Sequence, residues 1–237
     1  MRLLDLFCGA GGAAMGYHRA GFTEIVGVDI KPQPHYPFTF VQDDALDYLE
    51  GLIFDRATTR FDAIHASPPC QAYTTMRHVG KARLVERVRY PELIEVTRDL
   101  CRRAGLPYVI ENVVGSPLDR FNLCGSFFGL GVRRHRLFES NVLLLGQRCR
   151  HDPSAWPVAG WARREHRGPI AVYGDHPEDS AIHRRGKDKP GLTRRAATLA
   201  VAQRAMGIDW MTWPELTQAI PPAYTEYIGR QLLEYLR

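Results

Sequence analysis

The sequence of 237 residues predicts an α/β protein with a doubly wound, mostly parallel β-sheet and a small irregular region attached to it. Short apolar runs alternate with helical stretches through the first half of the chain, which is the pattern of parallel strands joined by helices. This periodicity fades after Arg136, and helical patterns return only near the C-terminus.

The predicted strands end beside residues that carry chemistry. Strands are predicted over residues 3–7, 24–29, 38–42, 61–66 and 106–110, and helices over 13–20, 91–104, 196–207 and 223–236. In doubly wound sheets, ligands bind at the carboxyl ends of the strands. We therefore expect one pocket to collect five groups, namely the glycine cluster at 8–12, Asp29, Asp44, Cys70 and Glu111.

The chain divides into three predicted segments. Residues 1–140 form the α/β unit with the pocket, and residues 141–195 form a small region in which Pro, Gly, Trp and Arg are scattered without periodicity. Residues 196–237 are expected to return to the α/β unit, with breaks in the helices at Pro214 and at Pro221-Pro222.

Composition and charge describe a folded domain with a basic segment. A hydrophobic content of 45% and a charged content of 24% exclude a disordered or fibrous chain. The net charge is +5, yet residues 120–195 hold 15 Lys and Arg against 7 Asp and Glu. This segment favours a groove for a polyanion, although a solvated basic surface has the same composition.

Targeting signals are not visible in the sequence. The segment after Met1 is too short and too acidic for a signal peptide, and no apolar run approaches ~20 residues. We therefore expect a cytoplasmic protein without a membrane span.

The cysteines are Cys8, Cys70, Cys101, Cys124 and Cys149. Their odd number, irregular spacing and lack of a Cys-x-x-Cys pair indicate a reducing compartment and exclude a disulfide framework. Cys149 and His151 are two conceivable metal ligands, but no second pair is obvious, so no metal site is expected.

A glycine-rich loop over residues 8–12 follows the first predicted strand. Glycines let the backbone approach a ligand and adopt positive φ. Asp29, at the end of the next strand, is placed to accept hydrogen bonds from ribose hydroxyls. The same residues also suit a tight turn with a helix-capping acid, and that alternative stays open.

Cys70 stands directly after two prolines, which hold the thiol in a fixed place at a strand end. Nearby basic residues can lower the pKa of such a thiol, which favours a nucleophile over a buried small hydrophobe. Glu111 ends the next strand and would lie beside Cys70 if the two strands are neighbours. Burial would then raise its pKa and let it share a proton with a substrate ring nitrogen, unless it is only a capping or ion-paired acid.

Four basic residues, Arg133 to Arg136, form a cluster after the fifth strand. Such a cluster suits a phosphate or a base carbonyl, although a solvated turn explains any single arginine as well.

In this order, the motifs resemble the DNA cytosine-C5 methyltransferase family, along nearly the whole chain and in a compact form similar to bacteriophage and bacterial members. The resemblance rests on Asp-Leu-Phe-Cys-Gly-Ala-Gly-Gly at 5–12, Ser-Pro-Pro-Cys-Gln at 67–71, Glu-Asn-Val at 111–113, Arg-His-Arg at 134–136 and Gln-Ala-Ile-Pro at 218–221. It implies a Rossmann-like methyltransferase fold in which residues 141–195 recognise the target.

The resemblance also implies the reaction and the residues that carry it. Cys70 would attack C6 of a flipped cytosine, Glu111 would contact the ring, and Arg134 and Arg136 would lie near the base. S-adenosylmethionine would be the methyl donor and S-adenosylhomocysteine the product. The residues implied to contact S-adenosylmethionine are Phe7, Gly9, Gly11, Asp29, Ile30, Asp44, Ala45, Pro69, Gln218 and Ala219. The implied partner is double-stranded DNA in a restriction–modification setting, bound by a monomer without an obligatory protein partner or metal.

Two positions depart from the family pattern. Val132 stands where the family usually has Gln, and Thr217-Gln218 replaces the usual Gly-Asn that opens the last motif. The segment from Ala72 to Tyr90 reads as a basic loop that could close on DNA, with Gly80 as a hinge, or as an ordinary surface loop.

Three other functions remain open from the sequence. A related enzyme could methylate transfer RNA, and a catalytically silent module could bind nucleic acid without needing Cys70 or Glu111. A small-molecule methyltransferase would need neither the Pro-Pro-Cys-Gln turn nor the basic second half.

Overall fold

A computed structural model describes residues 1–73, 91–118, 121–150, 169–173 and 194–237. Its main sheet has seven strands in the order β3-β2-β1-β4-β5-β7-β6. The strands are β1 (Arg2–Leu6), β2 (Glu24–Asp29), β3 (Thr39–Gln42), β4 (Ala63–Ala66), β5 (Tyr108–Val113), β6 (Phe121–Leu123) and β7 (Arg136–Ser140). The first five are parallel, and β7 is antiparallel to both β5 and β6. The predicted doubly wound, mostly parallel sheet is therefore confirmed.

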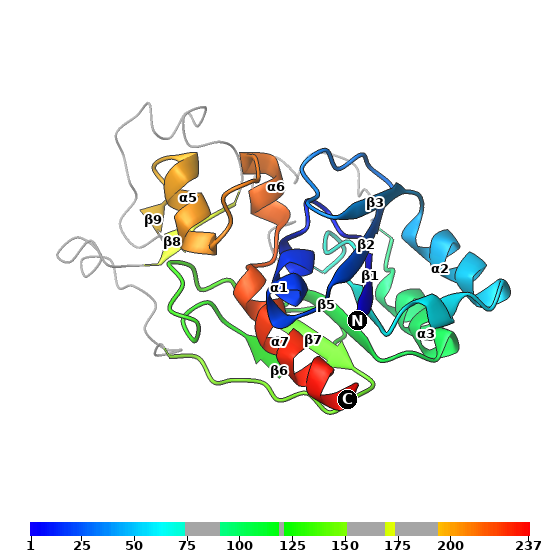
Figure 1. The fold of residues 1–237 in the computed structure, drawn as a ribbon. Helices are drawn as coiled ribbons and strands as arrows, with labels where there is room; N and C mark the ends of the chain where they lie inside the picture. Colours follow the sequence, from blue (N-terminus) through cyan, green and yellow to red (C-terminus); the bar gives the residue numbers. More distant parts are fainter. Residues whose placement is uncertain (74–90, 119–120, 151–168, 174–193) are drawn as a thin grey trace.

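Helices cover both faces of this sheet (Figure 1). They are α1 (Gly12–Ala20), α2 (Ala45–Phe54), α3 (Ile94–Ala104), α5 (Leu199–Met206), α6 (Trp213–Gln218) and α7 (Pro222–Tyr235), with a 3-10 turn at Thr58–Arg60. Helices α1 and α7 pack on one face, and α2 and α3 pack on the other. Among the described residues, no helix combines the length and the apolar character needed to cross a membrane.

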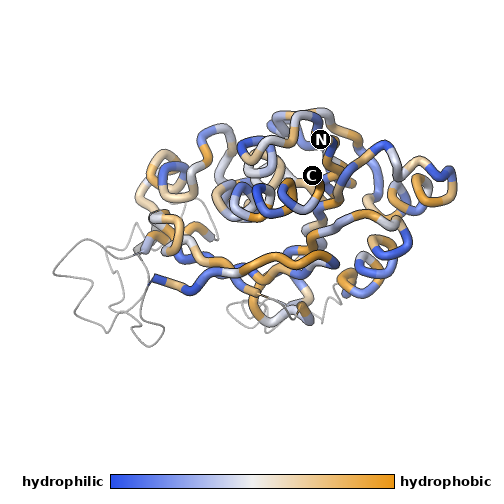
Figure 2. The backbone as a smooth tube through the Cα atoms, turned by 60° about the horizontal axis from the view of Figure 1, so that its bottom comes forward, coloured by the Kyte–Doolittle hydropathy of each residue, from blue (hydrophilic) through white to orange (hydrophobic). Residues whose placement is uncertain are grey.

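Each central strand is apolar on both sides because both faces of the sheet are covered. In β1, Leu3 packs with Tyr17 of α1 and Ile228 of α7, whereas Leu4 packs with Leu49 of α2 on the opposite face. Figure 2 shows this as hydrophobic colour along the inner strands, with hydrophilic and hydrophobic colour alternating on the helices. The two layers of core hold the carboxyl ends of the strands in a common edge.

The C-terminal helix is held against the first helix by close backbone contact. Thr225 Oγ1 donates a hydrogen bond of 2.8 Å to the carbonyl of Ala13. Gly16 of α1 faces Thr225 so closely that a Cβ there would lie 2.0 Å from Thr225 Oγ1 and 2.2 Å from the carbonyl of Pro222. Residues more than 200 positions apart thus form one face of the core.

The structure adds elements that the periodicity did not predict. The hairpin of β6 and β7 was not expected, because neither strand contains a continuous apolar run. Helix α2 follows Asp44, whose carboxylate accepts hydrogen bonds from the amides of Leu46 and Asp47. Helix α3 begins at Ile94 rather than at residue 91.

A third cluster of buried side chains lies beside the sheet. Helices α5 and α6 pack there with the short parallel pair β8 (Ile170–Ala171) and β9 (Arg194–Arg195). Met206, Met211 and Trp213 are buried in this cluster. Most of the irregular region expected at 141–195 lies outside the described residues, namely 151–168 and 174–193. The same holds for residues 74–90.

Candidate active site

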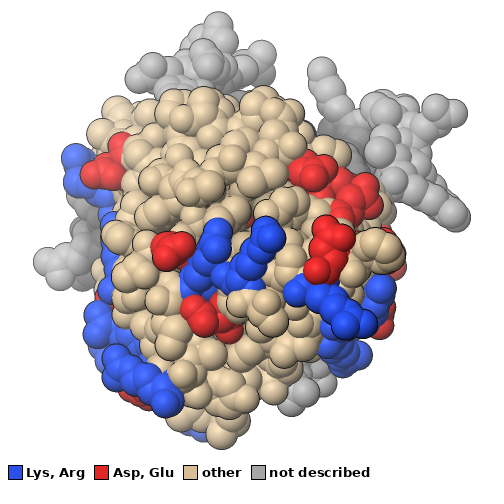
Figure 3. Space-filling model, turned by 45° about the vertical axis from the view of Figure 1, so that its right-hand side comes forward, with Lys and Arg blue, Asp and Glu red and all other residues tan. Residues whose placement is uncertain are grey.

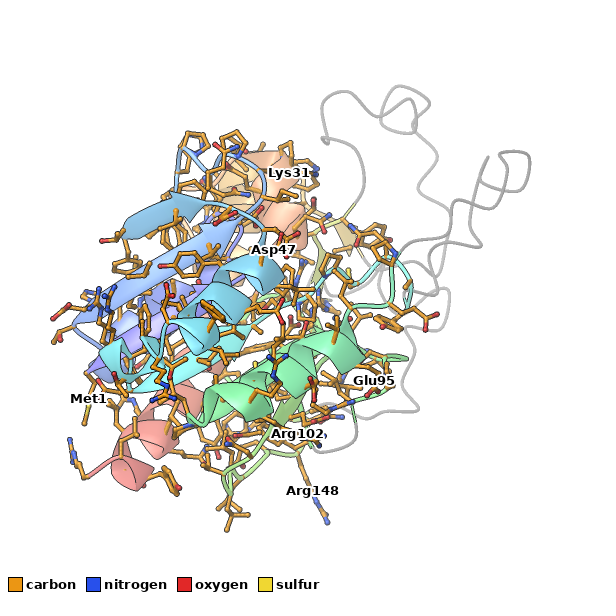
Figure 4. All side chains as sticks on the ribbon, turned by 90° about the vertical axis from the view of Figure 1, so that its right-hand side faces the viewer. Met1, Lys31, Asp47, Glu95, Arg102 and Arg148 are labelled. Carbon is orange, nitrogen blue, oxygen red and sulfur yellow. The ribbon has the colours of Figure 1, made fainter. Side chains whose placement is uncertain are left out.

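A cleft of about 1230 Å³ opens at the carboxyl ends of the parallel strands. Its lining includes every group expected to meet there, namely residues of the glycine cluster, Asp29, Asp44, Cys70 and Glu111. Figure 4 shows Lys31 and Asp47 toward this edge, away from Met1 at the beginning of β1. The sheet therefore brings together side chains that are up to 100 positions apart in the sequence.

The glycine-rich loop follows β1 and forms one wall of the cleft. Phe7, Gly9 and Gly11 all have positive φ, of 55°, 50° and 82°. This conformation turns the chain sharply between β1 and α1, and only glycine adopts it without strain. A Cβ on Gly9 would have no atom within 4 Å, so the loop leaves open space on its cleft side.

Asp29 holds the two loops at the ends of β1 and β2 in place. One carboxylate oxygen accepts a hydrogen bond of 3.0 Å from the amide of Gly9, and the other accepts one of 3.0 Å from the amide of Lys31. The adjacent Ile30 keeps 63% of its surface exposed on the cleft wall. An acid beside an exposed apolar side chain offers the paired polar and apolar contacts that a nucleoside requires.

Asp5 lies at the floor of the cleft and is fully buried. The Tyr36 hydroxyl donates a hydrogen bond of 3.1 Å to Oδ2, whereas Oδ1 makes no hydrogen bond among the described residues. Burial raises the pKa of Asp5 to about 7, the Tyr36 hydrogen bond lowers it, and the charge of Asp29 raises it further. A buried carboxylate oxygen without a partner is suited to a ligand group that donates hydrogen bonds, above all a cationic amine.

Cys70 and Glu111 come from neighbouring strands, as the sequence analysis required for their contact. Strand β4 pairs with β5 in parallel, with Ala66 opposite Ile110. Asn112 Nδ2 donates a hydrogen bond of 2.8 Å to the carbonyl of Pro68, which ties the loop that carries Cys70 to the end of β5. The thiol and the carboxyl group therefore line the same part of the cleft.

The thiol of Cys70 is not activated in the free protein. Burial raises its pKa, the charge of Arg136 lowers it, and the charge of Glu111 raises it. A lowered pKa was expected from the basic residues nearby, but desolvation outweighs their attraction in this half-buried position. In the free protein, the balance of these influences therefore favours the protonated thiol.

Glu111 is buried inside β5, two residues before the strand ends at Val113, because β5 extends beyond the range predicted from the sequence. Burial raises the pKa of Glu111. The charge of Arg136 and a hydrogen bond with Ser67 act in the opposite direction. Arg136 Nε lies 2.9 Å from Glu111 Oε1, but the angle does not make a hydrogen bond, so Oε1 keeps unused hydrogen-bonding capacity. The predicted rise in the pKa of Glu111 is thus present, and its cause is burial.

Behind Glu111 lies a buried polar chain that the sequence analysis missed. The His65 ring contacts the Tyr17 hydroxyl at 3.0 Å through Nδ1 and the Ser67 hydroxyl at 2.9 Å through Nε2. Burial lowers the pKa of His65 to about 3, which keeps the ring neutral. Ser67 connects this chain to Glu111. The only signal in the sequence was a histidine inside an apolar strand.

Arg134 has a different environment from Arg136. Its backbone has a positive φ of 37°, and its guanidinium donates hydrogen bonds to the carbonyls of Val172 and Thr217. These contacts join the turn before β7 to the third cluster and to α6. The charge of Arg134 still reaches the cleft, where it lowers the pKa of Glu111 and, as a minor contribution, that of Cys70.

The last predicted motif closes the cleft from the C-terminal side. Gln218 and Ala219 line it, and a Cβ on Gly12 would lie 2.5 Å from the carbonyl of Ile220. Helix α6 adds residues to the lining that no motif indicated, including Trp213 and Glu215. The remaining predicted cofactor contacts, Phe7, Gly9, Ile30, Asp44, Ala45 and Pro69, also line the cleft, whereas Gly11 is not among its lining residues.

The charges on the described face that carries α2 and α3 are balanced. Arg103 pairs with Glu50 at 3.4 Å, and Arg98 pairs with Glu95 at 2.6 Å and with Glu139 at 2.6 Å. Figure 3 shows Lys and Arg side chains next to Asp and Glu side chains on the face that it presents. The irregular region also contains Arg163, Arg164, Arg184 and Arg185, which suit contacts with phosphate groups. These arginines and the loop with Gly80 lie outside the described residues.

Comparison with protein families gives a match over the first half of the chain. Residues 1–115 match the family described as C-5 cytosine-specific DNA methylase. The range includes the glycine-rich loop, Asp29, Cys70 and Glu111, and ends shortly after β5.

Curated relatives match part of the chain. The type II methyltransferase M1.HphI of Haemophilus parahaemolyticus is 31% identical over 88 residues, which are 33% of this chain and 23% of the relative. M.AgeI of Thalassovita gelatinovora is 28% identical over 48% of this chain and 28% of the relative. M.AquIA of a Picosynechococcus species is 30% identical over 48% of this chain and 49% of the relative. The matched part of the chain spans less than half the length of each of these relatives.

Solved structures resemble the chain over its whole length. A prophage-encoded DNA modification methyltransferase of Escherichia coli has a TM-score of 0.61 and 16% identity, covering 100% of this chain and 99% of that one. The Dnmt2 methyltransferase of Schizosaccharomyces pombe has a TM-score of 0.53 and 14% identity over 100% of this chain and 99% of that one. At these identities the likeness establishes the shared fold.

Proposed function

We propose that the chain is an S-adenosylmethionine-dependent DNA cytosine-C5 methyltransferase of the C-5 cytosine-specific DNA methylase family, which residues 1–115 match. One observation carries the proposal. Cys70, on the loop after β4, and Glu111, in the adjacent strand β5, line the same cleft as the glycine-rich loop and Asp29. A nucleophile, a proton-sharing acid and a nucleoside-binding edge thus meet in one place.

The residues of the cleft fit the proposed cofactor. The open space at Gly9 and the free oxygen of Asp5 suit the methionine part, whose ammonium group can donate to that oxygen. When bound, S-adenosylmethionine supplies an electrophilic methyl group. Asp29 is placed for the ribose hydroxyls. The other proposed contacts are Phe7, Gly11, Ile30, Asp44, Ala45, Pro69, Gln218 and Ala219.

Cys70 is the proposed nucleophile toward the cytosine ring. Its sulfur forms a bond to C6, and the electron pair of the C5–C6 double bond moves toward C5, which becomes nucleophilic. After C5 has gained the methyl group, a base removes the C5 proton, the double bond returns, and the bond between sulfur and C6 breaks. Arg136 favours the thiolate in this sequence because its charge lowers the pKa of Cys70.

Glu111 is the proposed acid toward N3 of the ring. Because burial raises its pKa, it holds a proton more readily than an exposed carboxyl group and can share it with N3 as electron density enters the ring. Arg136 lies against the same carboxyl group and orients it. Arg134 holds the turn before β7 through its two carbonyl contacts and adds positive charge beside the base.

Double-stranded DNA is the proposed substrate, in a restriction–modification setting like that of the type II relatives. The cleft is closed on its inner side by the sheet, so a cytosine must leave the base stack to reach Cys70. We propose that residues 141–195, with their basic composition, contact the DNA and recognise its sequence. The chain would act as a monomer.

Expression in cells that lack cytosine methylation tests this proposal. Genomic DNA is digested and its nucleosides are measured by mass spectrometry for the wild type, Cys70→Ser and Cys101→Ala. Cys101 is a buried cysteine of α3 that is not among the residues lining the cleft, so its variant is the matched control. We expect 5-methylcytosine with the wild type and the control and none with Cys70→Ser.

Bisulfite sequencing of the same DNA would then give the recognised sequence. Modified cytosine in transfer RNA with none in DNA would contradict the DNA substrate, and its absence from both would contradict the enzymatic activity. Equal methylation by Cys70→Ser would contradict the assignment of the nucleophile.

A further inference from the structure

Three side chains with soft metal-ligand atoms meet beside the β6–β7 hairpin. Cys124 directly follows β6, His135 directly precedes β7, and Cys149 lies on the segment after β7. None of the three lines the cleft that contains Cys70. The group therefore has no part in the proposed methyl transfer and needs its own explanation.

The ligand atoms are close enough to share one ion. The two sulfurs and a ring nitrogen of His135 all lie within 4.8 Å of one another, and His135 Nε2 lies 3.2 Å from the Cys149 sulfur. Tetrahedral zinc would place two sulfurs about 3.8 Å apart and a sulfur and a nitrogen about 3.5 Å apart, from bond lengths of about 2.3 and 2.05 Å. Shifts of about 1 Å or less thus complete a coordination sphere.

The types of ligand favour zinc over other common ions. Thiolates and imidazole bind Zn²⁺ well, whereas Mg²⁺ and Ca²⁺ require oxygen ligands, and this group contains no carboxylate. Cys124 is fully buried, and His135 and Cys149 are half-buried, so the ion would be partly shielded from solvent. Three protein ligands leave a tetrahedral ion one further position, which a water molecule can fill.

We propose that Cys124, His135 and Cys149 bind a Zn²⁺ ion that fastens the β6–β7 hairpin to the segment after β7. The proposal does not depend on the proposed function. His151, the other ligand candidate from the sequence, lies outside the described residues.

The position of the ion suggests what it stabilises. The hairpin connection already has ties of its own, because the amide of Gly125 donates to the carbonyl of Arg133 at 2.7 Å and the Tyr224 hydroxyl donates to the carbonyls of Arg133 and Arg134. A bound ion would add a link from this connection to Cys149, beyond β7. His135 stands between Arg134 and Arg136, so zinc bound to its ring would fix the backbone that carries both arginines. Small regions that lack a large core are commonly stabilised by such ions.

Metal analysis of the purified full chain tests the proposal. Protein from zinc-supplemented cells is measured by plasma mass spectrometry for the wild type, Cys124→Ser, His135→Gln, Cys149→Ser and the control Cys101→Ala. We expect about one zinc per chain in the wild type and the control, and at least a fivefold loss in each ligand variant. A wild type without zinc, or ligand variants that retain it, would overturn the site.

A second measurement separates zinc binding from loss of folding in the variants. Cobalt added to the chelator-treated wild type should give an absorption band from charge transfer between thiolate and cobalt. This band should be absent with Cys149→Ser, a variant that should still fold because position 149 is only half-buried. Chelation should lower the melting temperature of the wild type by at least about 5 °C and leave that of Cys149→Ser unchanged. A disulfide between Cys124 and Cys149 would lower the mass of the chain by two hydrogen atoms in non-reducing mass spectrometry. If the isolated protein shows this lower mass, the zinc proposal is wrong.

Discussion

At the scale of single residues, the cleft places Cys70 between opposing influences. Burial and the charge of Glu111 raise the pKa of the thiol, whereas the charge of Arg136 lowers it. Glu111 and Arg136 also contact each other, so the charge that Cys70 experiences depends on the state of that pair. The reactivity of the thiol in the free protein is therefore a direct readout of the site's electrostatics.

Alkylation of Cys70 should respond with opposite signs to the two neighbours. Glu111→Gln removes a negative charge, so it lowers the pKa of the thiol and speeds alkylation by iodoacetamide at pH 8. Arg136→Gln removes a positive charge and slows it. The rate is followed at the Cys70 peptide by mass spectrometry, with Cys101→Ala, which leaves the cleft unchanged, measured alongside as the control. Changes of the same sign in both variants would contradict this account.

The buried carboxyl group of Asp5 links folding to pH. Its folded-state pKa of about 7 lies above the ordinary value of 3.8, so between these values the native protein binds more protons than the unfolded chain. The stabilisation is complete below about pH 4 and is lost as the pH rises through 7. An upper limit for this effect is about 4 kcal/mol.

The variant Asp5→Asn should remove this pH dependence. We expect the difference in unfolding free energy, wild type minus Asp5→Asn, to fall between pH 4 and 7 and to be level above pH 8, as measured by urea denaturation. The difference is needed because His65, whose burial lowers its pKa to about 3, gives the opposite trend. Asp5→Asn should also weaken binding of S-adenosylhomocysteine by at least tenfold in calorimetry. A flat difference profile would show that Asp5 is ionised in the free protein.

At the scale of elements, the contact between α1 and α7 joins the two ends of the chain. It depends on glycine at position 16, where a Cβ would collide with Thr225 and with the backbone of Pro222. Because backbone atoms cannot move aside as a flexible side chain can, relief of the collision must separate the helices.

Two helical glycines make a matched test of this contact. Gly16→Ala should destabilise the protein by about 1–3 kcal/mol because it forces α7 away from α1. Gly51→Ala, in α2 with no atom within 4 Å of the added Cβ, should stabilise it by about 0.5–1 kcal/mol through helix propensity. Chemical denaturation of both variants measures the two signs, and a stabilising effect of Gly16→Ala would contradict the packing.

At the scale of the whole molecule, charge is divided between the two halves of the chain. The described face with α2 and α3 balances its charges in ion pairs, whereas residues 120–195 hold the excess of Lys and Arg. DNA should therefore bind through the second half, with an affinity that depends strongly on salt.

The salt dependence of duplex DNA binding tests this division. Each phosphate contact contributes about 0.9 to the slope of log K against log salt concentration. The double variant Arg163→Ala and Arg164→Ala should lower the slope by about 1–2 in fluorescence anisotropy. Arg103→Ala, which removes the partner of Glu50 on the balanced face, should leave the slope unchanged. The opposite ranking would place the DNA on the face with α2 and α3.

Much of the fold follows from local sequence because its signals are local. Apolar runs with fixed lengths predicted the five parallel strands, and Ala66 and Ile110 lie in adjacent strands as the Cys70–Glu111 contact required. The hairpin β6–β7 was not predicted because its strands, Phe-Asn-Leu and Arg-Leu-Phe-Glu-Ser, mix polar with apolar residues and give no continuous apolar run. Helix α6 was not predicted because six residues make fewer than two helical turns. Their position depends on what they pack against.

The sequence by itself determined the parallel sheet, the glycine-rich turn and the place of Cys70 and Glu111 at strand ends, because each rests on residue type and short-range spacing. Only the tertiary structure decided the electrostatics of the site, such as the raised pKa of Cys70 and the buried chain from Tyr17 through His65 to Ser67. It also brought Cys124, His135 and Cys149 together, although no spacing motif joins them. Desolvation and contacts between distant segments depend on three-dimensional distance, which a linear pattern does not contain.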